Sequence, residues 1–408
     1  MSVRAGIITI GNEILLGRTL NSNLAWLGNE LTRVGIDVRE ALTVKDEKAE
    51  IESALKRSWE RYDLVISTGG LGPTEDDVTK SAIADFFGKE LDFDPEIWGE
   101  IQKSFSQRGM KIAEINRNQA MVPRGFEVLN NEMGTAPGLC FRDSSKIFFA
   151  LQGVPIEMKH VYNKHIAPRL GREFADLRGI NQRTLHSFGI AESALAEIIH
   201  KNDLPREVDL AWLPQSGRVD LRLISSDSKA LAHAESILMD RAGEYIWGVD
   251  ADSPASVLLD LLQSQNLSLA AAESCTAGLM QAYLAEVPGA SKSLLGGVVS
   301  YANSLKEELL KVEDLQENSA VSEATAIAMA KGVRDLCHSD VAISITGIAG
   351  PDGGSKKKPV GTVHMAFCIK DRVFHKKLLL FGDRAGIRHK SAESAMLLLI
   401  KLLQGKEI

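Results

Sequence analysis

Along the first third of the chain, short apolar runs alternate with segments whose apolar residues recur every three or four positions. The runs are typical of buried strands, and the periodic segments are typical of helices with one apolar face. The predicted strands are residues 4–10, 38–44 and 64–68. The helices between them are one capped by Asn21, with Leu24, Leu27 and Leu31 on one face, and one over residues 47–62. Alternating strands and helices favour a largely parallel sheet covered on both faces, with ligands bound beyond the carboxyl ends of its strands.

The pattern changes after a helix predicted over residues 156–170. Residues 180–248 then predict the order strand, helix, strand, strand, helix, which is a small α+β module. A helix at residues 255–266 and a strand at residues 268–272 begin another α/β unit, which runs to the end of the chain. We therefore predict a three-layer α/β domain at residues 1–170, a small α+β module at residues 171–250 and a second three-layer α/β domain at residues 251–408.

Composition narrows the range of functions. The chain has 408 residues, of which 44% are hydrophobic and 25% charged, as in ordinary globular proteins. Its net charge of -7 argues against nucleic acid as the main partner but leaves small phosphorylated ligands open. The 4 cysteines form no CxxC pair, which disfavours a zinc site and a disulfide scaffold. No apolar stretch is long enough to span a bilayer, so we expect a cytoplasmic protein without membrane contact.

The densest motif is STGGLGPTEDDVT at residues 67–79, directly after a predicted strand. Its glycines, Gly69, Gly70 and Gly72, allow the backbone to approach a phosphate closely. The carboxylates Glu75, Asp76 and Asp77 follow at once, and acidic side chains beside a phosphate cradle are expected where a divalent metal lies between them.

Two further acidic residues, Asp46 and Glu13, follow neighbouring strands and are expected at the same edge of the sheet. Oxygen ligands favour Mg²⁺ or Mn²⁺ over zinc, and we predict Asp46, Asp76 and Asp77 as the metal ligands. One aspartate could instead act as a general base for water. Alternatively, Asp76 and Asp77 could simply occupy the first turn of a helix, where acidic side chains are favourable.

A second candidate site lies in the last third, where residues 269–278 pass from a predicted strand to a helix and Ser274 falls on the turn. A helix from about Thr276 would direct its free N–H groups toward Ser274 Oγ, which suits a nucleophilic alkoxide and an oxyanion. No obvious His–Asp pair accompanies the serine. Instead, Tyr301 and Lys306 follow the next strand. A lysine kept neutral by burial can accept the serine proton, and Tyr301 could orient it.

Simpler interpretations of these residues stay open. Ser274 could be only a helix cap, and Tyr301 and Lys306 could be ordinary surface residues. A Gly-rich loop at residues 344–354 could cradle a phosphate or oxyanion, or could be a plain turn. Cys275 is a rival nucleophile, although a lone cysteine is more often buried and inert.

Three motifs of the last third, ESCTAG at residues 273–278, YxNxxK at 301–306 and TGIAGPDGG at 346–354, together resemble the C-terminal domain of the CinA family. The resemblance implies hydrolysis of nicotinamide mononucleotide (NMN) to nicotinate mononucleotide and ammonia without a cofactor, with Ser274 as nucleophile and Tyr301 and Lys306 as its catalytic partners. The implied substrate-binding residues are Glu273, Thr276, Gly278, Asn303, Thr346, Gly347, Ala349, Gly350 and Arg388. One departure is Ala277, where the family usually has glycine.

The first third resembles the molybdopterin-binding fold and, more closely, the N-terminal domain of CinA. The motifs are GNEI at residues 11–14, TGGLGPT at 68–74, GTAPG at 134–138 and GVPxEM at 153–158. The resemblance implies metal-dependent hydrolysis of ADP-ribose to AMP and ribose 5-phosphate, with Asp46 and Asp77 as the acidic pair at the reacting phosphate. The implied substrate-binding residues are Gly11, Asn12, Glu13, Thr68, Gly69, Gly70, Gly72 and Thr74.

The middle module is likened to a KH fold within the family. It has no GxxG loop and no basic stripe, so we expect it to serve packing or dimerisation and not RNA binding. As a whole, the resemblance implies a homodimeric, bifunctional enzyme of pyridine nucleotide recycling that acts on NMN and ADP-ribose. Two alternatives stay open: a molybdopterin-handling protein with a spectator C-terminal domain, and a non-enzymatic partner in competence or recombination.

Overall fold

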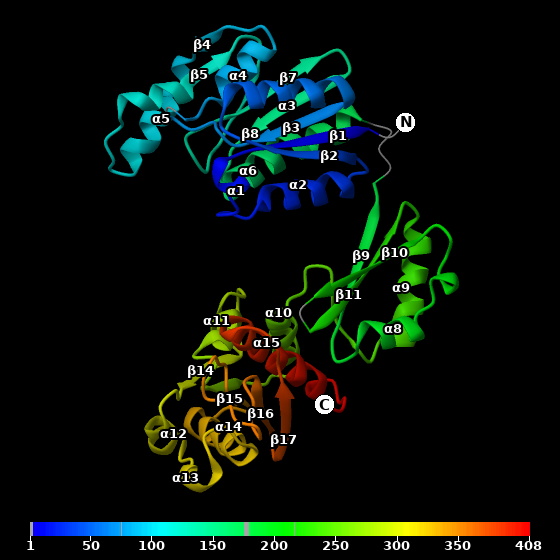
Figure 1. The fold of residues 1–408 in the computed structure, drawn as a ribbon, viewed down its shortest axis with the longest axis vertical. Helices are drawn as coiled ribbons and strands as arrows, with labels where there is room; N and C mark the ends of the chain where they lie inside the picture. The colour runs from blue at the N-terminus through cyan, green and yellow to red at the C-terminus, as the bar shows by residue number, and fades with distance from the viewer. Residues whose placement is uncertain (1–2, 75, 175–178, 216) are drawn as a thin grey trace. The chain divides into compact units, whose positions relative to one another are not determined.

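The computed structural model describes residues 3–74, 76–174, 179–215 and 217–408. The chain divides into two compact units, Met1–Asn181 and Gln182–Ile408, each with its own sheets and hydrophobic cores (Figure 1). Among the described residues, no helix is long and apolar enough to cross a membrane.

The N-terminal unit is built on a six-stranded sheet in the order β2-β1-β3-β8-β7-β6. The strands are β1 (Arg4–Ile10), β2 (Asp37–Val44), β3 (Leu64–Thr68), β6 (Glu127–Leu129), β7 (Gly138–Asp143) and β8 (Lys146–Leu151). The first three lie where the apolar runs predict them, and they pair in parallel with one another and with β8. β7 and β6 pair antiparallel at one edge. A small separate pair joins β4 (Leu91–Phe93) to β5 (Met121–Pro123).

Alternate residues of the central strands face two different cores. Ile8 and Val65 belong to one core, together with residues of α3 and α4, while Ile7 and Leu64 belong to the other, with residues of α2 and α6. The helices are α1 (Asn12–Leu15), α2 (Ser22–Arg33), α3 (Lys48–Arg61), α4 (Thr79–Phe86), α5 (Pro95–Gln107), α6 (Pro155–Val161) and α7 (Ala167–Glu173). Because helices cover both faces, the unit has three layers, as predicted.

The ends of two predicted helices can be compared with the structure. The Asn21 side chain accepts a hydrogen bond of 3.0 Å from Leu24 N, so it caps α2 as predicted. The single helix predicted over residues 156–170 is instead divided by a π-helical turn, Tyr162–Ile166, between α6 and α7.

The middle module has a four-stranded sheet in the order β10-β11-β9-β12. Its elements are β9 (Asn181–Ser187), α8 (Glu192–Ile198), β10 (Asp209–Gln215), β11 (Arg218–Ser225), α9 (Ser228–Ala242) and β12 (Ile246–Val249). The predicted order omits β12, which is only four residues long and has no alternating pattern. Trp247 of β12 packs into the core of the C-terminal domain, which joins the module to that domain.

The C-terminal domain has a five-stranded sheet in the order β14-β13-β15-β16-β17. Its strands are β13 (Leu269–Glu273), β14 (Leu294–Val299), β15 (Val341–Gly347), β16 (Thr362–Ile369) and β17 (Arg372–Leu379). Its helices are α10 (Pro254–Ser264), α11 (Leu279–Ala285), α12 (Asn303–Leu310), α13 (Leu315–Asn318), α14 (Glu323–Cys337) and α15 (Arg384–Leu403). Separate cores on the two faces make this domain a second three-layer α/β structure, which confirms the predicted fold class.

Candidate active sites

A cavity of about 600 Å³ opens at the carboxyl ends of β1, β3 and β8 in the N-terminal unit. We call it the nucleotide cavity. It is lined by nine of the residues that sequence analysis assigns to this site: Gly11, Glu13, Asp46, Thr68, Gly69, Gly70, Gly72, Asp76 and Asp77. The parallel strands bring these residues together because their carboxyl ends meet at one edge of the sheet. Glu75 lies outside the described residues.

The loop after β3 passes so close to neighbouring atoms that Gly69 and Gly70 could not carry a side chain without a shift. Gly69 and Gly70 have φ values of 110° and 64°, in the region that favours glycine. A Cβ at Gly70 would lie 2.0 Å from Thr79 Oγ1 and 3.7 Å from Asp46 Oδ1. A Cβ at Gly69 would lie 2.1 Å from the Ile10 carbonyl oxygen. The backbone therefore passes between α4, β1 and Asp46 only because these positions carry no side chain.

Asn12 and Thr74 do not line the nucleotide cavity but orient its aspartates. Asn12 N donates a hydrogen bond of 2.9 Å to Asp46 Oδ2, and Thr74 donates from N (2.9 Å) and Oγ1 (2.6 Å) to Asp77 Oδ2. The other oxygen of Asp77, Oδ1, accepts no hydrogen bond from the described residues, so it is available to a ligand, whereas the Asp46 carboxylate also accepts from its own backbone amide. Asp76 and Asp77 precede α4, which begins at Thr79, so they do not occupy its first turn.

The electrostatics of this cavity favour a bound cation. Burial raises the pKa of Asp46, the hydrogen bond from Asn12 lowers it, and the charges of Glu13 and Asp76 raise it further. The described residues contain no group of three His, Cys, Asp or Glu side chains placed to hold a metal ion by themselves. The described residues therefore do not bring the predicted ligands Asp46, Asp76 and Asp77 together as a metal site by themselves, and a metal ion at this cavity stays a prediction.

In the C-terminal domain, three loops meet at one edge of the sheet. Glu273 at the end of β13 is in register with Val299 of β14 and Ile345 of β15. Ser274 follows directly, and its backbone N donates a hydrogen bond of 2.9 Å to the Ile345 carbonyl. The turn after Ser274, the Tyr301 loop and the loop after Thr346 are therefore neighbours, as their positions after parallel strands predict.

The helix after Ser274 differs from the prediction. It begins at Leu279 and not near Thr276, because Ala277 and Gly278 have φ values of 51° and 87° and form a left-handed turn. The first free N–H groups of α11 are also occupied: Glu273 Oε2 accepts from Met280 N (3.2 Å) and Oε1 from Gln281 N (2.9 Å). Glu273 is fully buried, and a buried carboxylate needs donors close by. The helix N-terminus therefore stabilises Glu273 and not an alkoxide at Ser274, and the predicted binding residue has a structural role.

Lys306 is buried and not a surface residue, with 1% of its surface exposed. Burial lowers the pKa of its ammonium group, as a proton-accepting lysine requires. Nζ donates to the carbonyls of Ser300 (2.7 Å) and Tyr301 (3.3 Å), and within the described part of the chain Ser274 Oγ has no hydrogen-bond partner. The structure thus brings Lys306 to the loop beside the serine but directs its hydrogen bonds to backbone oxygens.

Tyr301 and Cys275 are placed very differently. Tyr301 is 55% exposed, and its hydroxyl accepts a hydrogen bond of 2.7 Å from Arg384 Nη2 instead of contacting Lys306. Cys275 is buried, and burial raises the pKa of its thiol to about 12. A thiol that stays protonated at neutral pH is a poor nucleophile, which favours Ser274, itself 9% exposed.

Comparison with known proteins covers all three domains. The chain matches family models described as a probable molybdopterin binding domain (residues 6–172), the KH domain of damage-inducible protein CinA (182–248) and the CinA C-terminal domain (251–403). A putative competence-damage inducible protein of Caldanaerobacter subterraneus subsp. tengcongensis is 38% identical over 100% of both chains. The chain belongs to the CinA family. A CinA-like protein of Gemmatimonas aurantiaca is 40% identical over 96% of this chain and 94% of its own length.

A solved structure of a CinA protein is similar to part of the chain. A crystal structure of the protein CinA with unknown function from Thermoplasma acidophilum is 38% identical, covers 40% of this chain and 95% of its own, and has a TM-score of 0.37. The family models and the full-length relatives confirm, at the level of family and domain types, the resemblance on which sequence analysis relies.

Two arginines of the CinA C-terminal domain have distinct roles that the sequence does not separate. Arg388, predicted to bind substrate, donates to the carbonyls of Cys275 (Nε, 3.2 Å) and Thr276 (Nη2, 2.8 Å), so it holds the turn after Ser274. Arg384 donates to the Gly350 carbonyl (Nη1, 2.6 Å) as well as to Tyr301, so it joins the two other loops of the site. Sequence analysis missed Arg384, although it lies only four positions before Arg388.

The remaining predicted residues of this site lie in the three loops but contribute in different ways. Asn303 is exposed at the start of α12, whereas Thr346 Oγ1 donates to the Ala320 carbonyl (2.7 Å). Thr276 is fully buried and its Oγ1 has no hydrogen-bond partner among the described residues, which is costly without a ligand. Gly347 ends β15, and Ala349 and Gly350 follow it; a Cβ at Gly347 would lie 2.9 Å from the Thr362 carbonyl oxygen.

The N-terminal domain also contains polar residues to which sequence analysis assigns no role, although Thr135 and Glu157 lie within the GTAPG and GVPxEM motifs. Gln119, Thr135, Gln152 and Glu157 line the nucleotide cavity. Lys80, only 7% exposed, donates from Nζ to the Asn118 carbonyl, and Asn118 Nδ2 donates to the Pro73 carbonyl at 3.3 Å. Burial lowers the pKa of Lys80 to about 8, while the charge of Asp77 raises it. Through Asn118, these contacts connect Lys80 of α4 to Pro73 in the glycine loop. Asn118 is too far from the loop in sequence for a motif to reveal the connection.

Proposed function

We propose that this CinA-family protein is a bifunctional hydrolase of pyridine nucleotide breakdown products. The C-terminal domain would hydrolyse NMN to nicotinate mononucleotide and ammonia. The N-terminal domain would hydrolyse ADP-ribose to AMP and ribose 5-phosphate with a divalent metal ion. Both reactions remove products of the breakdown of nicotinamide dinucleotides, which makes their presence in one chain coherent.

The amidase proposal rests mainly on the buried Lys306 beside the turn that carries Ser274. Ser274 Oγ attacks the carboxamide carbon of NMN while its proton passes to neutral Lys306 Nζ. The tetrahedral intermediate then collapses, the C–N bond breaks, and the departing nitrogen takes the proton from Lys306 Nζ and leaves as ammonia, which returns Lys306 to its neutral form. Water hydrolyses the remaining ester at Ser274 and releases nicotinate mononucleotide. Lys306 must exchange a carbonyl partner for Ser274 Oγ when the substrate binds, because apo contacts of a general base often rearrange.

Ammonia release from NMN tests this proposal. We expect release by the natural chain and a loss of at least about a thousandfold in Ser274→Ala, since removing a serine nucleophile leaves only residual catalysis. Ser304→Ala, on the same edge of the domain but exposed, is the matched control and should behave as the natural chain. Equal release by the natural chain and Ser274→Ala would exclude Ser274 as the nucleophile, and no release by a folded natural chain would exclude the amidase.

The pyrophosphatase proposal rests on the nucleotide cavity, whose volume of about 600 Å³ falls in the usual range for small-ligand sites. The backbone of Gly69–Gly72 can approach a phosphate closely, and Asp46, Asp76 and Asp77 would hold the metal. When bound, the ion would neutralise phosphate charge and make water a better nucleophile. Asn12 and Thr74 keep Asp46 and Asp77 directed toward it through their hydrogen bonds.

Calorimetry with ADP-ribose and Mg²⁺, followed by assay for AMP, tests this second reaction. We expect binding and turnover that Asp77→Asn reduces at least about a hundredfold, because the substitution removes a charge at the reacting phosphate. The description of the matching model as a molybdopterin binding domain supports one rival function. Binding of molybdopterin without binding of ADP-ribose would favour that rival. A homodimer stays a prediction, which sedimentation of the full chain would test.

A further inference from the structure

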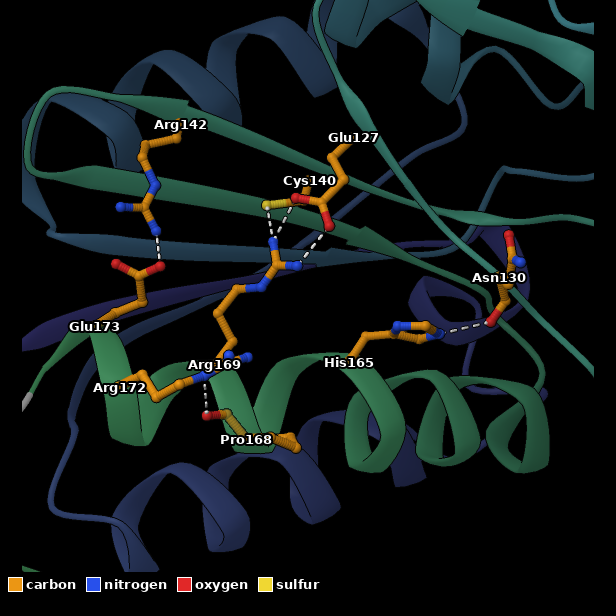
Figure 2. Close-up of polar contacts among 9 residues, drawn as sticks. All are labelled: Glu127, Asn130, Cys140, Arg142, His165, Pro168, Arg169, Arg172 and Glu173. Carbon is orange, nitrogen blue, oxygen red and sulfur yellow. Dashed lines mark hydrogen bonds and ion pairs between the residues drawn. The ribbon is translucent and has the colours of Figure 1, made fainter.

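A second polar cavity lies in the N-terminal unit, away from the residues of either proposed reaction. It has a volume of about 590 Å³ and is lined by Gly125, Glu127, Cys140, Arg142, Arg169, Arg172 and Glu173. We call it the arginine cavity. None of these described residues also lines the nucleotide cavity. Its walls are the edge strand β6, the neighbouring β7 and the helix α7 (Figure 2).

The first arginine is held firmly in place. Arg169 donates from Nη1 to Glu127 Oε2 (2.7 Å) and from Nη2 to Glu127 Oε1, a two-point contact that fixes the guanidinium plane. Nη1 also donates to Cys140 Sγ at 3.4 Å, so the buried thiol forms part of the cavity wall. Arg169 is only 19% exposed, which makes its position well defined before any ligand arrives.

The other two arginines are less occupied. Arg142 forms an ion pair with Glu173 through Nη2. Arg172 donates from Nε to the Pro168 carbonyl of its own helix at 3.2 Å, and its Nη groups have no acceptor among the described residues. Figure 2 shows the guanidinium groups of Arg142 and Arg169 each turned toward a carboxylate, whereas Arg172 has none.

The charges in this cavity do not cancel. Three guanidinium groups face two carboxylates, which leaves one positive charge in a chain whose net charge is -7. Arginine is the side chain best suited to two-point contact with phosphate oxygens, because its donors form a planar fork. We propose that the arginine cavity binds a phosphate-class dianion, either inorganic phosphate or the phosphate group of a small phosphomonoester, independently of the two reactions proposed above.

The ion pairs give this proposal a distinctive signature. A phosphate competes with Glu127 for Arg169 and with Glu173 for Arg142, whereas no described residue competes for the Nη groups of Arg172. Removing Arg172 should therefore weaken phosphate binding, and neutralising Glu127 should strengthen it. A purely structural ion-pair network would not give effects of opposite sign.

Calorimetric titration of the full chain with inorganic phosphate tests the proposal. We expect Arg172→Gln to lower the affinity by about tenfold, the loss of a charge-assisted contact, and Glu127→Gln to raise it. Glu173→Gln frees Arg142 and replaces Glu127→Gln if that variant does not fold. Lys164→Gln removes the same charge as Arg172→Gln, but Lys164 pairs with Glu132 outside the cavity, so this control should bind phosphate as the natural chain does.

The remaining outcomes separate this cavity from other phosphate sites. The nucleotide cavity also has room for phosphate, but Arg172 and Glu127 do not line it. Phosphate binding that is absent, or that neither variant alters, would overturn the proposal. So would weaker binding in both variants, since the ion pairs would then be structural. Repeating the titration with ribose 5-phosphate shows whether a phosphomonoester binds through the same residues, and we expect Arg172→Gln to weaken it equally.

Discussion

The two candidate active sites differ in how far their side chains are already occupied. In the nucleotide cavity, Asp77 uses Oδ2 for Thr74, and its Oδ1 accepts no hydrogen bond from the described residues. Around Ser274, by contrast, the polar groups bind one another: Glu273 caps α11, Arg388 holds two carbonyls, and Lys306 donates to two more. The first site is open to its ligand as it stands, whereas the second must exchange hydrogen bonds before it can react.

The difference follows from how each site is made. A phosphate cradle consists of backbone, and the glycines that permit it create an empty space by their lack of side chains. A serine nucleophile needs a base of suitable pKa, and a lysine can serve as that base when burial lowers its pKa. Burial of Lys306 in turn requires acceptors for its donors, which the carbonyls of Ser300 and Tyr301 provide.

The largest effect that would sharpen this contrast is expected at Lys306. Lys306→Met should lower ammonia release from NMN by about a thousandfold, because a general base contributes on the order of 10² to 10⁴ and its carbonyl partners would also be left unpaired. As the base must be neutral, activity of the natural chain should rise with pH through a pKa below 10.5, since burial lowers the pKa of Lys306. The pH profile of kcat/KM measures this limb, which the variant should lack.

Lys311→Met is a suitable control for that experiment, since Lys311 is exposed at the end of the same helix. Its activity and pH profile should match those of the natural chain. If Lys306→Met kept most of its activity, Lys306 would not be the general base. The site around Ser274 would then not need to exchange the hydrogen bonds of Lys306 before it reacts.

In the nucleotide cavity, the next largest effect is expected from a single methyl group. Gly70→Ala places a Cβ at 2.0 Å from Thr79 Oγ1, so the loop must shift, and a shift of about 1 Å in a site can cost a hundredfold in rate. Gly88→Ala is a matched control, because Gly88 has nearly the same φ (63° against 64°) but nothing within 4 Å of the added atom. Hydrolysis of ADP-ribose should fall only in the first variant. A similar loss in both would mean that backbone strain, not space in the cavity, is responsible.

Substitution of Arg384 or Arg388, the two arginines that hold the loops around Ser274, is expected to have a smaller effect, about tenfold, on the hydrolysis of NMN. Arg384→Gln removes the contacts that join the Tyr301 loop to Gly350 and should raise KM for NMN, because the two loops are then no longer held together before substrate binds. Arg388→Gln leaves the carbonyls of Cys275 and Thr276 without donors and should lower kcat and the melting temperature instead. Steady-state kinetics and thermal unfolding distinguish the two. Interchanged results would reverse the roles assigned to these residues.

The smallest effect is expected at Cys275. Its thiol has a pKa raised to about 12 by burial, so it stays protonated across the working pH range. Cys275→Ala should change ammonia release by less than about threefold, since an inert thiol contributes packing only. A loss as large as that of Ser274→Ala would instead make Cys275 the nucleophile.

Sequence alone predicted the three-layer architecture of both α/β domains and nine of the residues that line the nucleotide cavity. Apolar runs gave the central strands, because burial imposes a short-range pattern that the chain displays directly. The glycines and aspartates after those strands could be assigned to one site, because the ends of parallel strands necessarily meet. The family resemblance added the identity of Ser274, Tyr301 and Lys306, which spacing by itself left open.

Tertiary structure decided which donors and acceptors pair. The turn at Ala277 and Gly278 delays α11, and Glu273 then takes the amides that were predicted to serve Ser274. Arg388 reaches the carbonyl of Cys275, 113 positions away, while Arg384 reaches Tyr301, 83 positions away. A hydrogen bond depends on distances of a few tenths of an ångström between groups that only the packed chain brings together, and local sequence patterns contain no measure of such distances.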